Sequence, residues 1–312
     1  MQRLQRSLEQ SCCIKRGASW NFRHNALVNT TIQRTIARGW VIALLLWAQA
    51  LSAATCLGDS SARSQSVYVV PQLAAAHLYA HWAPFLQQLG QRTGSCFELM
   101  IPKNIPDFEA ALIKGLPDFA FMNPYHQVMA YRAQKYVPLV ADGQNKLDGL
   151  LVVRKDSTIR SIKELHDARI AFPAPNAFAA SLVIRATLAH DDVAITPLYV
   201  KSHENVYRAV IMGDALAGGG VNNTLEREPQ EVREQLRVLM RTPFYMPHPF
   251  SAHPRISAAE QTRIAEAMVQ MGSDEQLKPL LYEIQINQPV KVNYQRDYQP
   301  LDQLGLGKFV VQ

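Results

Sequence analysis

Short apolar stretches alternate with amphipathic segments from residue 67 onward. The stretches Val67–Val70, Phe97–Ile101 and Phe119–Met122 are four or five residues long, which is typical of buried strands. Between the first two, apolar residues recur every three or four positions, which predicts a helix with one buried face (Leu78, Trp82, Phe85, Leu86, Leu89) that Gly90 and Gly94 help to end. The alternation predicts βαβ units, largely parallel sheets and therefore an α/β fold.

Two such series follow each other along the chain and predict two lobes with a ligand cleft between them. We expect residues 64–149 to form the first lobe and residues 150–245 the second, each a mainly parallel sheet flanked by helices. The proline-rich passage Pro243–Pro254 is interpreted as the return connection. Residues 246–312 contain two further helical patterns, which we expect to pack back on the first lobe.

The first 54 residues have the order of a secretory signal. Basic residues come first, the 12-residue apolar run Trp40–Leu51 follows, and small residues come next. Cleavage is expected after Ala50 or Ala54, and the mature protein is expected in the periplasm. The alternative is a single membrane anchor or a buried helix, although the run is short for a membrane span.

Export affects the interpretation of the four cysteines. Cys12 and Cys13 lie in the leader, so the mature chain keeps Cys56 and Cys96. Disulfides persist in an oxidising compartment, and we therefore predict a Cys56–Cys96 bridge. The alternative is a lipid anchor on Cys56, which the preceding Thr55 fits poorly.

Composition and charge exclude several classes of protein. With 48% apolar and 19% charged residues, the 312-residue chain is not disordered. Its net charge of +6 is confined to the leader, because seven basic and one acidic residue precede residue 54 and 25 of each sign follow. The basic balance therefore does not indicate a nucleic-acid partner.

Four strand-to-helix junctions carry the candidate chemistry. Ligands of open α/β sheets bind at the carboxyl ends of strands, where helices begin with unpaired N–H groups. The junctions are Pro71-Gln72, Asn123 to His126, Pro173 to Ala177, and Lys201 to His203. Together they suit a small anion held in a cleft, while the alternative is that Asn176 and Ser202 are ordinary helix N-caps.

Other signals carry less weight. His77 and His81 are spaced for one helix face, but no third metal ligand matches them, so no metal and no cofactor is predicted. Gly218 to Gly220 lacks the lysine of a phosphate loop and predicts instead a strand that another backbone approaches closely. No nucleophile stands near a base in the sequence, so no catalytic residue is assigned and an enzyme is not expected.

Three runs resemble a known family in their order and spacing. They are DFAFMNPYHQV at 118–128, SIKELHDARIAF at 161–172 and SHENVYRAV at 202–210. These runs are similar to the periplasmic phosphate/phosphite/phosphonate-binding proteins of ABC importers, and the resemblance spans about residues 65 to 300. It implies the two-lobed type II periplasmic-binding fold and a binder that closes on its ligand.

The resemblance also implies site residues. Tyr125 matches the family's ligand-facing tyrosine, and His203 begins the helix where the family often has a polar contact. The family's hydroxyl-rich turn at the second-lobe helix start is replaced here by PAPNAFAAS, and an expected acidic residue by AGGG. Both departures point to a different or less charged ligand than phosphonate itself. From the residues and the resemblance together, the expected ligand contacts are Asn123, Tyr125, His126, Asn176, Ala177, Phe178, Ala179, Ser181, His203 and Asn222.

The leading hypothesis is a monomeric extracytoplasmic binder that captures a small anionic or polar molecule for an ABC permease. The alternative keeps the fold, but the closed form is read by a membrane sensor kinase. A third possibility, an enzyme that reuses the cleft, lacks a positioned nucleophile.

Overall fold

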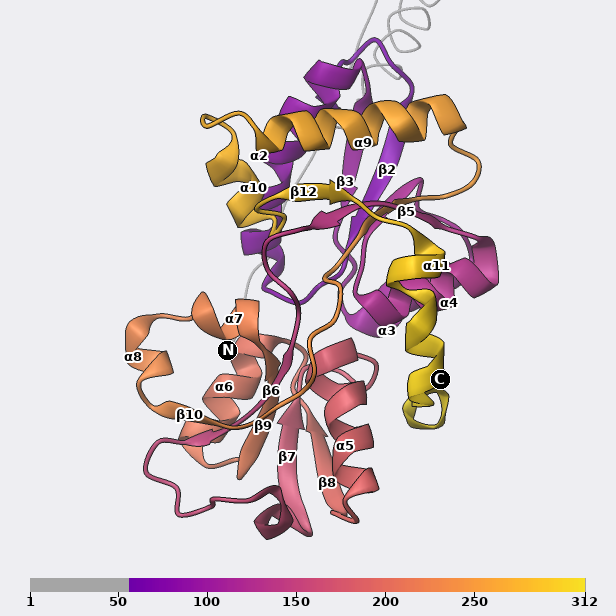
Figure 1. The fold of residues 1–312 in the computed structure, drawn as a ribbon. Helices are drawn as coiled ribbons and strands as arrows, with labels where there is room; N and C mark the ends of the chain where they lie inside the picture. The colour runs from indigo at the N-terminus through magenta and orange to yellow at the C-terminus, as the bar shows by residue number, and fades with distance from the viewer. Residues whose placement is uncertain (1–55, 312) are drawn as a thin grey trace, which may run out of the picture. The chain divides into compact units, whose positions relative to one another are not determined.

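The structure is a computed structural model that describes residues 56–311 (Figure 1). The expected leader, residues 1–54, lies outside the described residues, as do its cleavage sites. Across residues 56–311, every helix is too short or too polar to cross a membrane.

The first of two sheets has seven strands, in the spatial order β1-β3-β2-β4-β11-β5-β12. Strand β2 pairs in parallel with β3 and with β4, and all the other pairs of this sheet are antiparallel. The strands are β1 (Leu57–Gly58), β2 (Ser64–Val69), β3 (Cys96–Met100), β4 (Phe119–Phe121), β5 (Val137–Asp142), β11 (Phe250–Ala252) and β12 (Pro289–Lys291).

Helices cover this first sheet, and α2 shows how an apolar face packs. All five apolar residues of its predicted face are buried, and the helix packs against α9 and α10. Gly94 ends α2 in a left-handed conformation, as expected, whereas Gly90 lies inside the helix, where its Cα packs against Gly58. The helical segments here are α2 (Ala75–Thr93), α3 (Ile105–Ile113), α4 (Pro124–Gln134), α9 (Ala258–Gly272), α10 (Lys278–Glu283), α11 (Tyr294–Asp297) and the 3₁₀ turns η4 (Gln299–Leu304) and η5 (Leu306–Phe309).

The second sheet has five strands in the order β10-β6-β9-β7-β8. It consists of β6 (Gly149–Arg154), β7 (Ala168–Phe172), β8 (Ile195–Tyr199), β9 (Ala217–Val221) and β10 (Leu236–Arg241). Its helical segments are the 3₁₀ turn η2 (Ile162–Leu165), the π-helical η3 (Phe178–Val183), α5 (Ile184–His190), α6 (His203–Met212), α7 (Asn222–Glu226) and α8 (Gln230–Arg233).

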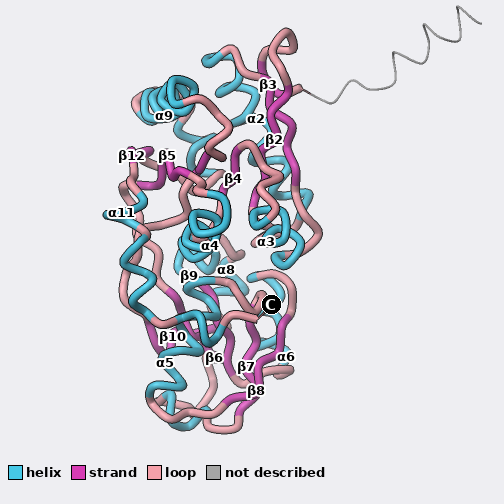
Figure 2. Tube along the Cα trace, turned by 90° about the vertical axis from the view of Figure 1, so that its right-hand side faces the viewer, coloured by secondary structure: helices cyan, strands magenta, loops and turns pink. Residues whose placement is uncertain are grey.

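Strand β6 shows how the second sheet is buried on both faces. Leu151 and Val153 pack in one apolar cluster with residues of α5, whereas Leu150 and Val152 pack in another with residues of α6. Successive side chains of a strand point to opposite faces. The two helices therefore cover opposite faces of the sheet, as Figure 2 shows.

The sheets are mixed, which corrects the expectation of mainly parallel sheets. The chain crosses between the sheets twice, from β5 to β6 and from β10 to β11. The strands next to these crossings pair antiparallel with their neighbours in the sheets. The crossings pair with each other: Leu147 N–H donates to the Tyr245 carbonyl at 3.0 Å, and the reverse bond is 2.8 Å.

The passage Pro243–Pro254 is more than a connection. It contains β11, which lies between β4 and β5 in the first sheet. Strands β5, β11 and β12 were all missed from sequence. β11 and β12 are only three residues long, too short for an alternation to be visible.

The glycine run in β9 has the close backbone neighbour that the sequence predicted. A Cβ on Gly219 would overlap the carbonyl oxygen of Ala180, and one on Gly149 of β6 would overlap the carbonyl oxygen of Ala179. The start of η3 therefore lies directly on two strands that have no side chains at the contact.

Cys56 and Cys96 are joined in a disulfide with their Cα atoms 5.2 Å apart. The bridge adds a covalent link beside the pairing of β1 with β3, in which Gly58 is the partner of Cys96.

We predict that Gly219→Ala lowers the free energy of unfolding by about 1–3 kcal/mol, because its methyl group meets a carbonyl oxygen of a packed backbone. Gly307→Ala is the matched control, since a Cβ there has no neighbour within 4 Å. Urea unfolding of both variants measures the difference. Equal stabilities would show that the contact between η3 and β9 is not tight.

Candidate functional site

A small cavity lies where helices of both sheets begin. Its volume is about 20 Å³, room for a single water molecule. Its walls come from the carboxyl ends of β2, β4 and β9, from the starts of η3 and α6, and from both crossings. The lining residues are Val70, Gln72, Ile105, Asn123, Leu147, Ala177, Phe178, Ala179, Ala180, His203, Val221 and His248. The cavity is where the four strand-to-helix junctions were expected to meet.

Backbone N–H groups at the start of η3 are the main hydrogen-bond donors of this cavity. The first helical bonds run from the N–H groups of Ser181 and Leu182 to the carbonyl of Ala177. Within residues 56–311, the N–H groups of Phe178, Ala179 and Ala180 therefore have no backbone acceptor, and no side chain accepts from them. Unpaired N–H groups and the positive end of the helix dipole together favour an anion.

Two buried histidines face the same cavity. Burial lowers the pKa of His203 to about 4. Burial, and then the neighbouring His126 and His203, lower the pKa of His248 to about 3. Both imidazoles are therefore neutral at neutral pH, and each can donate one N–H.

The contacts of the two histidines differ. His203 Nδ1 lies 3.3 Å from Thr224 Oγ1, whereas His248 Nδ1 is buried without a partner in the described chain. The His248 ring also stacks on Phe121 with the centroids 5.4 Å apart. Sequence reasoning missed His248 as a cavity residue, although its position in the return crossing, between Pro247 and Pro249, was the available signal.

Asn123 and Gln72 complete the polar lining. Asn123 is the N-cap of α4: its Oδ1 accepts from the His126 N–H at 2.8 Å, and its Nδ2 lies 3.4 Å from the Asn176 carbonyl. Gln72 donates from Nε2 to Gln285 Oε1 at 3.0 Å. Both side chains therefore serve the fold as well as lining the cavity.

Of the predicted contacts, Asn123, Ala177, Phe178, Ala179 and His203 line the cavity. The other five are not among its lining residues, so their role as ligand contacts stays a prediction. They are Tyr125, His126, Asn176, Ser181 and Asn222.

Hydrogen-bond partners explain where three of these side chains point. His126 is fully buried with Nε2 at 2.9 Å from Glu109 Oε1. Asn176 donates to Glu109 Oε2 and to the Val311 carbonyl, both at 2.9 Å, and accepts from the Val311 N–H at 3.0 Å. Ser181 Oγ accepts from Arg185 Nε at 3.1 Å.

The remaining two side chains also lie elsewhere. Burial raises the pKa of the Tyr125 phenol, and the Arg132 guanidinium opposes the shift. Asn222 lines a separate polar pocket, where it donates to the Lys146 carbonyl at 2.9 Å.

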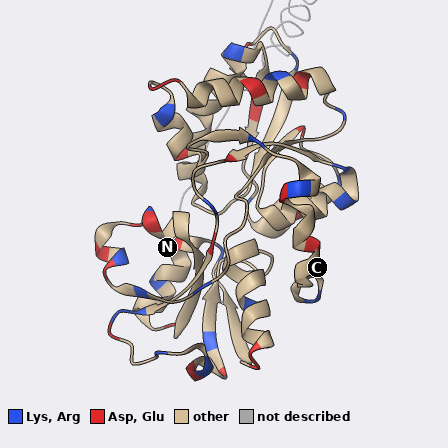
Figure 3. Cartoon of the chain, viewed as in Figure 1, with Lys and Arg blue, Asp and Glu red and all other residues tan. Residues whose placement is uncertain are grey.

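The cavity lining is uncharged. It contains no lysine, arginine, aspartate or glutamate, and no hydroxyl or thiol side chain. Elsewhere on the described chain, residues of both signs are interspersed (Figure 3). Any anion bound in the cavity would therefore be held by neutral N–H donors rather than by a cation.

Comparison with known families identifies the protein class. Residues 67–298 match the family model described as "ABC transporter, phosphonate, periplasmic substrate-binding protein". The chain belongs to this family. Its members are extracytoplasmic solute-binding proteins, as the resemblance of the three sequence runs indicated.

Solved structures confirm the two-lobed type II periplasmic-binding fold. A binding component of an ABC phosphonate transporter from Pseudomonas aeruginosa is 17% identical, with a TM-score of 0.70 over 78% of this chain and 86% of that one. PhnD1 from Prochlorococcus marinus, solved with methylphosphonate, is 15% identical, with a TM-score of 0.71 over 78% and 97%. A Xanthomonas citri protein bound to chloride ion is 17% identical, with a TM-score of 0.63 over 79% and 98%. Among curated proteins, the comparison found no match.

We predict that acid destabilises this phosphonate-binding family member through His203. Its pKa in the folded protein, about 4, is lower than the ordinary value of 6.5, so the unfolded chain takes up a proton first. The stabilisation is complete above pH 6.5 and is lost as the pH falls towards 4, by about 3 kcal/mol. Urea unfolding at several pH values measures this loss.

The His203→Gln variant should lose less stability between pH 6.5 and pH 4 than the parent does. The control is His190→Gln, whose imidazole is 88% exposed. An identical acid loss in the parent and in His203→Gln would refute the assignment.

Proposed function

We propose that this protein captures a small oxyanion of the phosphonate, phosphite or phosphate type between its two lobes and delivers it to an ABC importer. The observation that carries the proposal is that Phe178, Ala179 and Ala180, whose N–H groups have no acceptor within residues 56–311, line the cavity together with His203. Free N–H groups at a helix start are suited to the oxygens of a tetrahedral anion.

The replacement of a hydroxyl-rich turn by alanines and Phe178 is compatible with this proposal. Backbone N–H groups do not depend on side-chain identity, so an anion cradle survives the substitution. The loss of hydroxyl donors weakens the hold on a dianion, and the neutral histidines add no opposite charge. We therefore expect affinity for a singly charged or partly protonated oxyanion.

The size of the cavity requires a conformational change. A volume of about 20 Å³ does not admit a tetrahedral oxyanion, so ligand enters when the lobes separate. The two crossings, residues 143–148 and 242–249, are the segments that connect the sheets, and we propose that they act as the hinge. The liganded form must therefore hold the lobes further apart at this cavity than they are here, and contacts of the ligand to both lobes shift the population towards that form.

The setting of the protein follows from the family. We propose that residues 1–54 direct export and that the mature protein works as a monomer in the periplasm. The partner is an ABC permease rather than a sensor kinase, because the family model describes a transporter component. Genes for a permease and an ATPase beside this one would support the importer, and a sensor-kinase gene in their place would contradict it.

The role is that of a binder rather than a catalyst. The cavity lining offers no hydroxyl, thiol or carboxylate that could act as a nucleophile, and its two histidines are buried and neutral.

Isothermal titration calorimetry with methylphosphonate, phosphite and phosphate tests the proposal. We expect binding of at least one, and a Kd raised at least tenfold by His203→Ala, because an N–H donor of the cavity is removed. Tyr125→Phe is the matched control and is expected to change the Kd less than twofold, since Tyr125 is not among the residues that line the cavity.

Two outcomes would contradict the proposal. If none of the three anions binds, the ligand belongs to another class. If Tyr125→Phe weakens binding as much as His203→Ala does, the ligand lies at α4 instead of at η3.

A further inference from the structure

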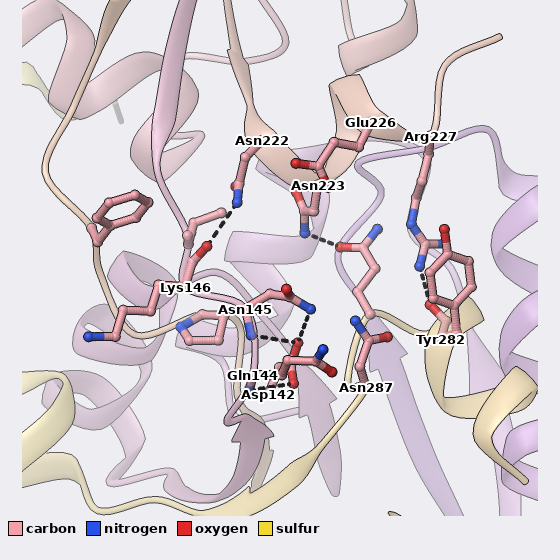
Figure 4. Close-up of a pocket in the computed structure, with 14 residues that line it drawn as sticks. Asp142, Gln144, Asn145, Lys146, Asn222, Asn223, Glu226, Arg227, Tyr282 and Asn287 are labelled. Carbon is pink, nitrogen blue, oxygen red and sulfur yellow. Dashed lines mark hydrogen bonds between the residues drawn. The ribbon is translucent and has the colours of Figure 1, made fainter. Parts of the chain in front are cut away.

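A second pocket, of about 250 Å³, lies beside the crossings (Figure 4). Its walls come from α7 in the second sheet's layer, from the crossing after β5, and from the loop between α10 and β12. Six carboxamide side chains line it, and we call it the amide pocket: Gln144, Asn145, Asn222, Asn223, Gln285 and Asn287.

The amide pocket and the anion cavity lie on two sides of one wall. Val221 lines the cavity and Asn222 the pocket, His248 lines the cavity and Pro247 the pocket, and Leu147 lines both. The two spaces are therefore neighbours but have different chemistry, because the cavity contains no charged residue and the pocket is larger and rich in amides.

The four charged residues of the pocket balance one another, because Asp142 and Glu226 oppose Lys146 and Arg227. Asp142 accepts hydrogen bonds from the N–H groups of Gln144, Asn145 and Gln288 and from the Asn145 side chain, at 2.9–3.3 Å. Arg227 donates to the carbonyls of Tyr282 and Glu283, stacks on the Tyr282 ring at 4.5 Å and lies 3.6 Å from Glu283 Oε2. Lys146 and Glu226 are exposed, so an incoming ligand meets six amides and a lining without net charge.

The side-chain oxygens of two of those amides lack a hydrogen-bond donor within residues 56–311. Asn223 Oδ1 and Asn287 Oδ1 are buried, and no donor reaches either one within residues 56–311. The Asn223 Nδ2 donates to Gln285 Oε1 at 2.6 Å, so this side chain is held in place with its oxygen unsatisfied. A buried acceptor without a donor costs free energy. Protein atoms cover both oxygens here, so a ligand O–H or N–H would recover that free energy only once the side chains turn towards the pocket.

An aromatic ring stands at the edge of the pocket. Phe244, in the return crossing, lines it and is 65% exposed. An exposed ring offers an apolar face to the C–H side of a ligand, while the amides can both donate to and accept from hydroxyl groups.

We propose that the amide pocket is a binding site for an uncharged, hydroxyl-rich ring or chain of about monosaccharide size. The carboxamides hydrogen-bond the hydroxyl groups, the unsatisfied oxygens of Asn223 and Asn287 accept from them, and Phe244 covers the C–H face. The site does not require that the anion cavity bind a phosphonate. The hydroxylated group belongs either to a free polyol or to the substituent of a phosphate or phosphonate ester whose head occupies the cavity.

Calorimetric titration of the purified protein with D-glucose, myo-inositol, glycerol and glucose 6-phosphate tests the site. We expect at least one to bind, with a Kd raised at least tenfold by Phe244→Ala and by Asn287→Ala. Both side chains are partly exposed, so the fold should tolerate their loss. Tyr79→Ala, which removes an aromatic ring that is 49% exposed on α2, is the matched control and should leave the Kd within twofold.

The titrations distinguish a free polyol from the hydroxylated substituent of a phosphate or phosphonate ester. Binding of a free polyol that is insensitive to His203→Ala identifies an independent ligand. Binding of glucose 6-phosphate alone, weakened both by Phe244→Ala and by His203→Ala, identifies one ligand that spans both spaces.

The proposal is overturned if none of the four compounds binds, or if Phe244→Ala and Asn287→Ala behave like Tyr79→Ala. Its failure is distinguishable from that of the proposed oxyanion function. If the protein binds glucose but binds none of methylphosphonate, phosphite and phosphate, only the proposed oxyanion function is refuted.

Discussion

The contact between η3 and two glycine positions sets the geometry of the candidate site. The carbonyls of Ala179 and Ala180 lie where side chains would stand on Gly149 and Gly219, so the helix start rests directly on the middle of the second sheet. This contact fixes the position of the helix start relative to the sheet. A larger residue at either glycine would lift the helix start away from the sheet and move its free donors.

The site that results is neutral and mostly built from backbone. Its donors are N–H groups and two histidines, and burial lowers the pKa of both imidazoles. Keeping His203 and His248 uncharged avoids an unpaired buried cation, at the cost of stability in acid. The same neutrality leaves selectivity for an oxyanion to the helix dipole and to the geometry of the donors.

Contacts across the cleft tie the site to the rest of the chain. The C-terminal segment reaches the second lobe, where Asn176 bonds Val311 in both directions and Arg185 donates to the Phe309 carbonyl at 2.7 Å. On another side, Gln285 Oε1 accepts both from Gln72 of the first lobe and from Asn223 of the second. The proposed separation of the lobes would break these bonds, which stabilise the present conformation from outside the anion cavity.

The sequence by itself determined the fold class, the long helices and the identity of the residues at the helix starts, because periodicity, capping residues and glycine act over short distances along the chain. Asn123, His203 and the start of η3 could be named in this way. Only the tertiary structure decided that β11 joins the first sheet, that His248 lines the cavity, and that the side chain of Asn176 bonds to Glu109 and Val311. These outcomes depend on segments that are distant in sequence, such as the C-terminal residues that hydrogen-bond to Asn176. A local sequence pattern does not encode which of two neighbouring groups a buried polar side chain will hydrogen-bond.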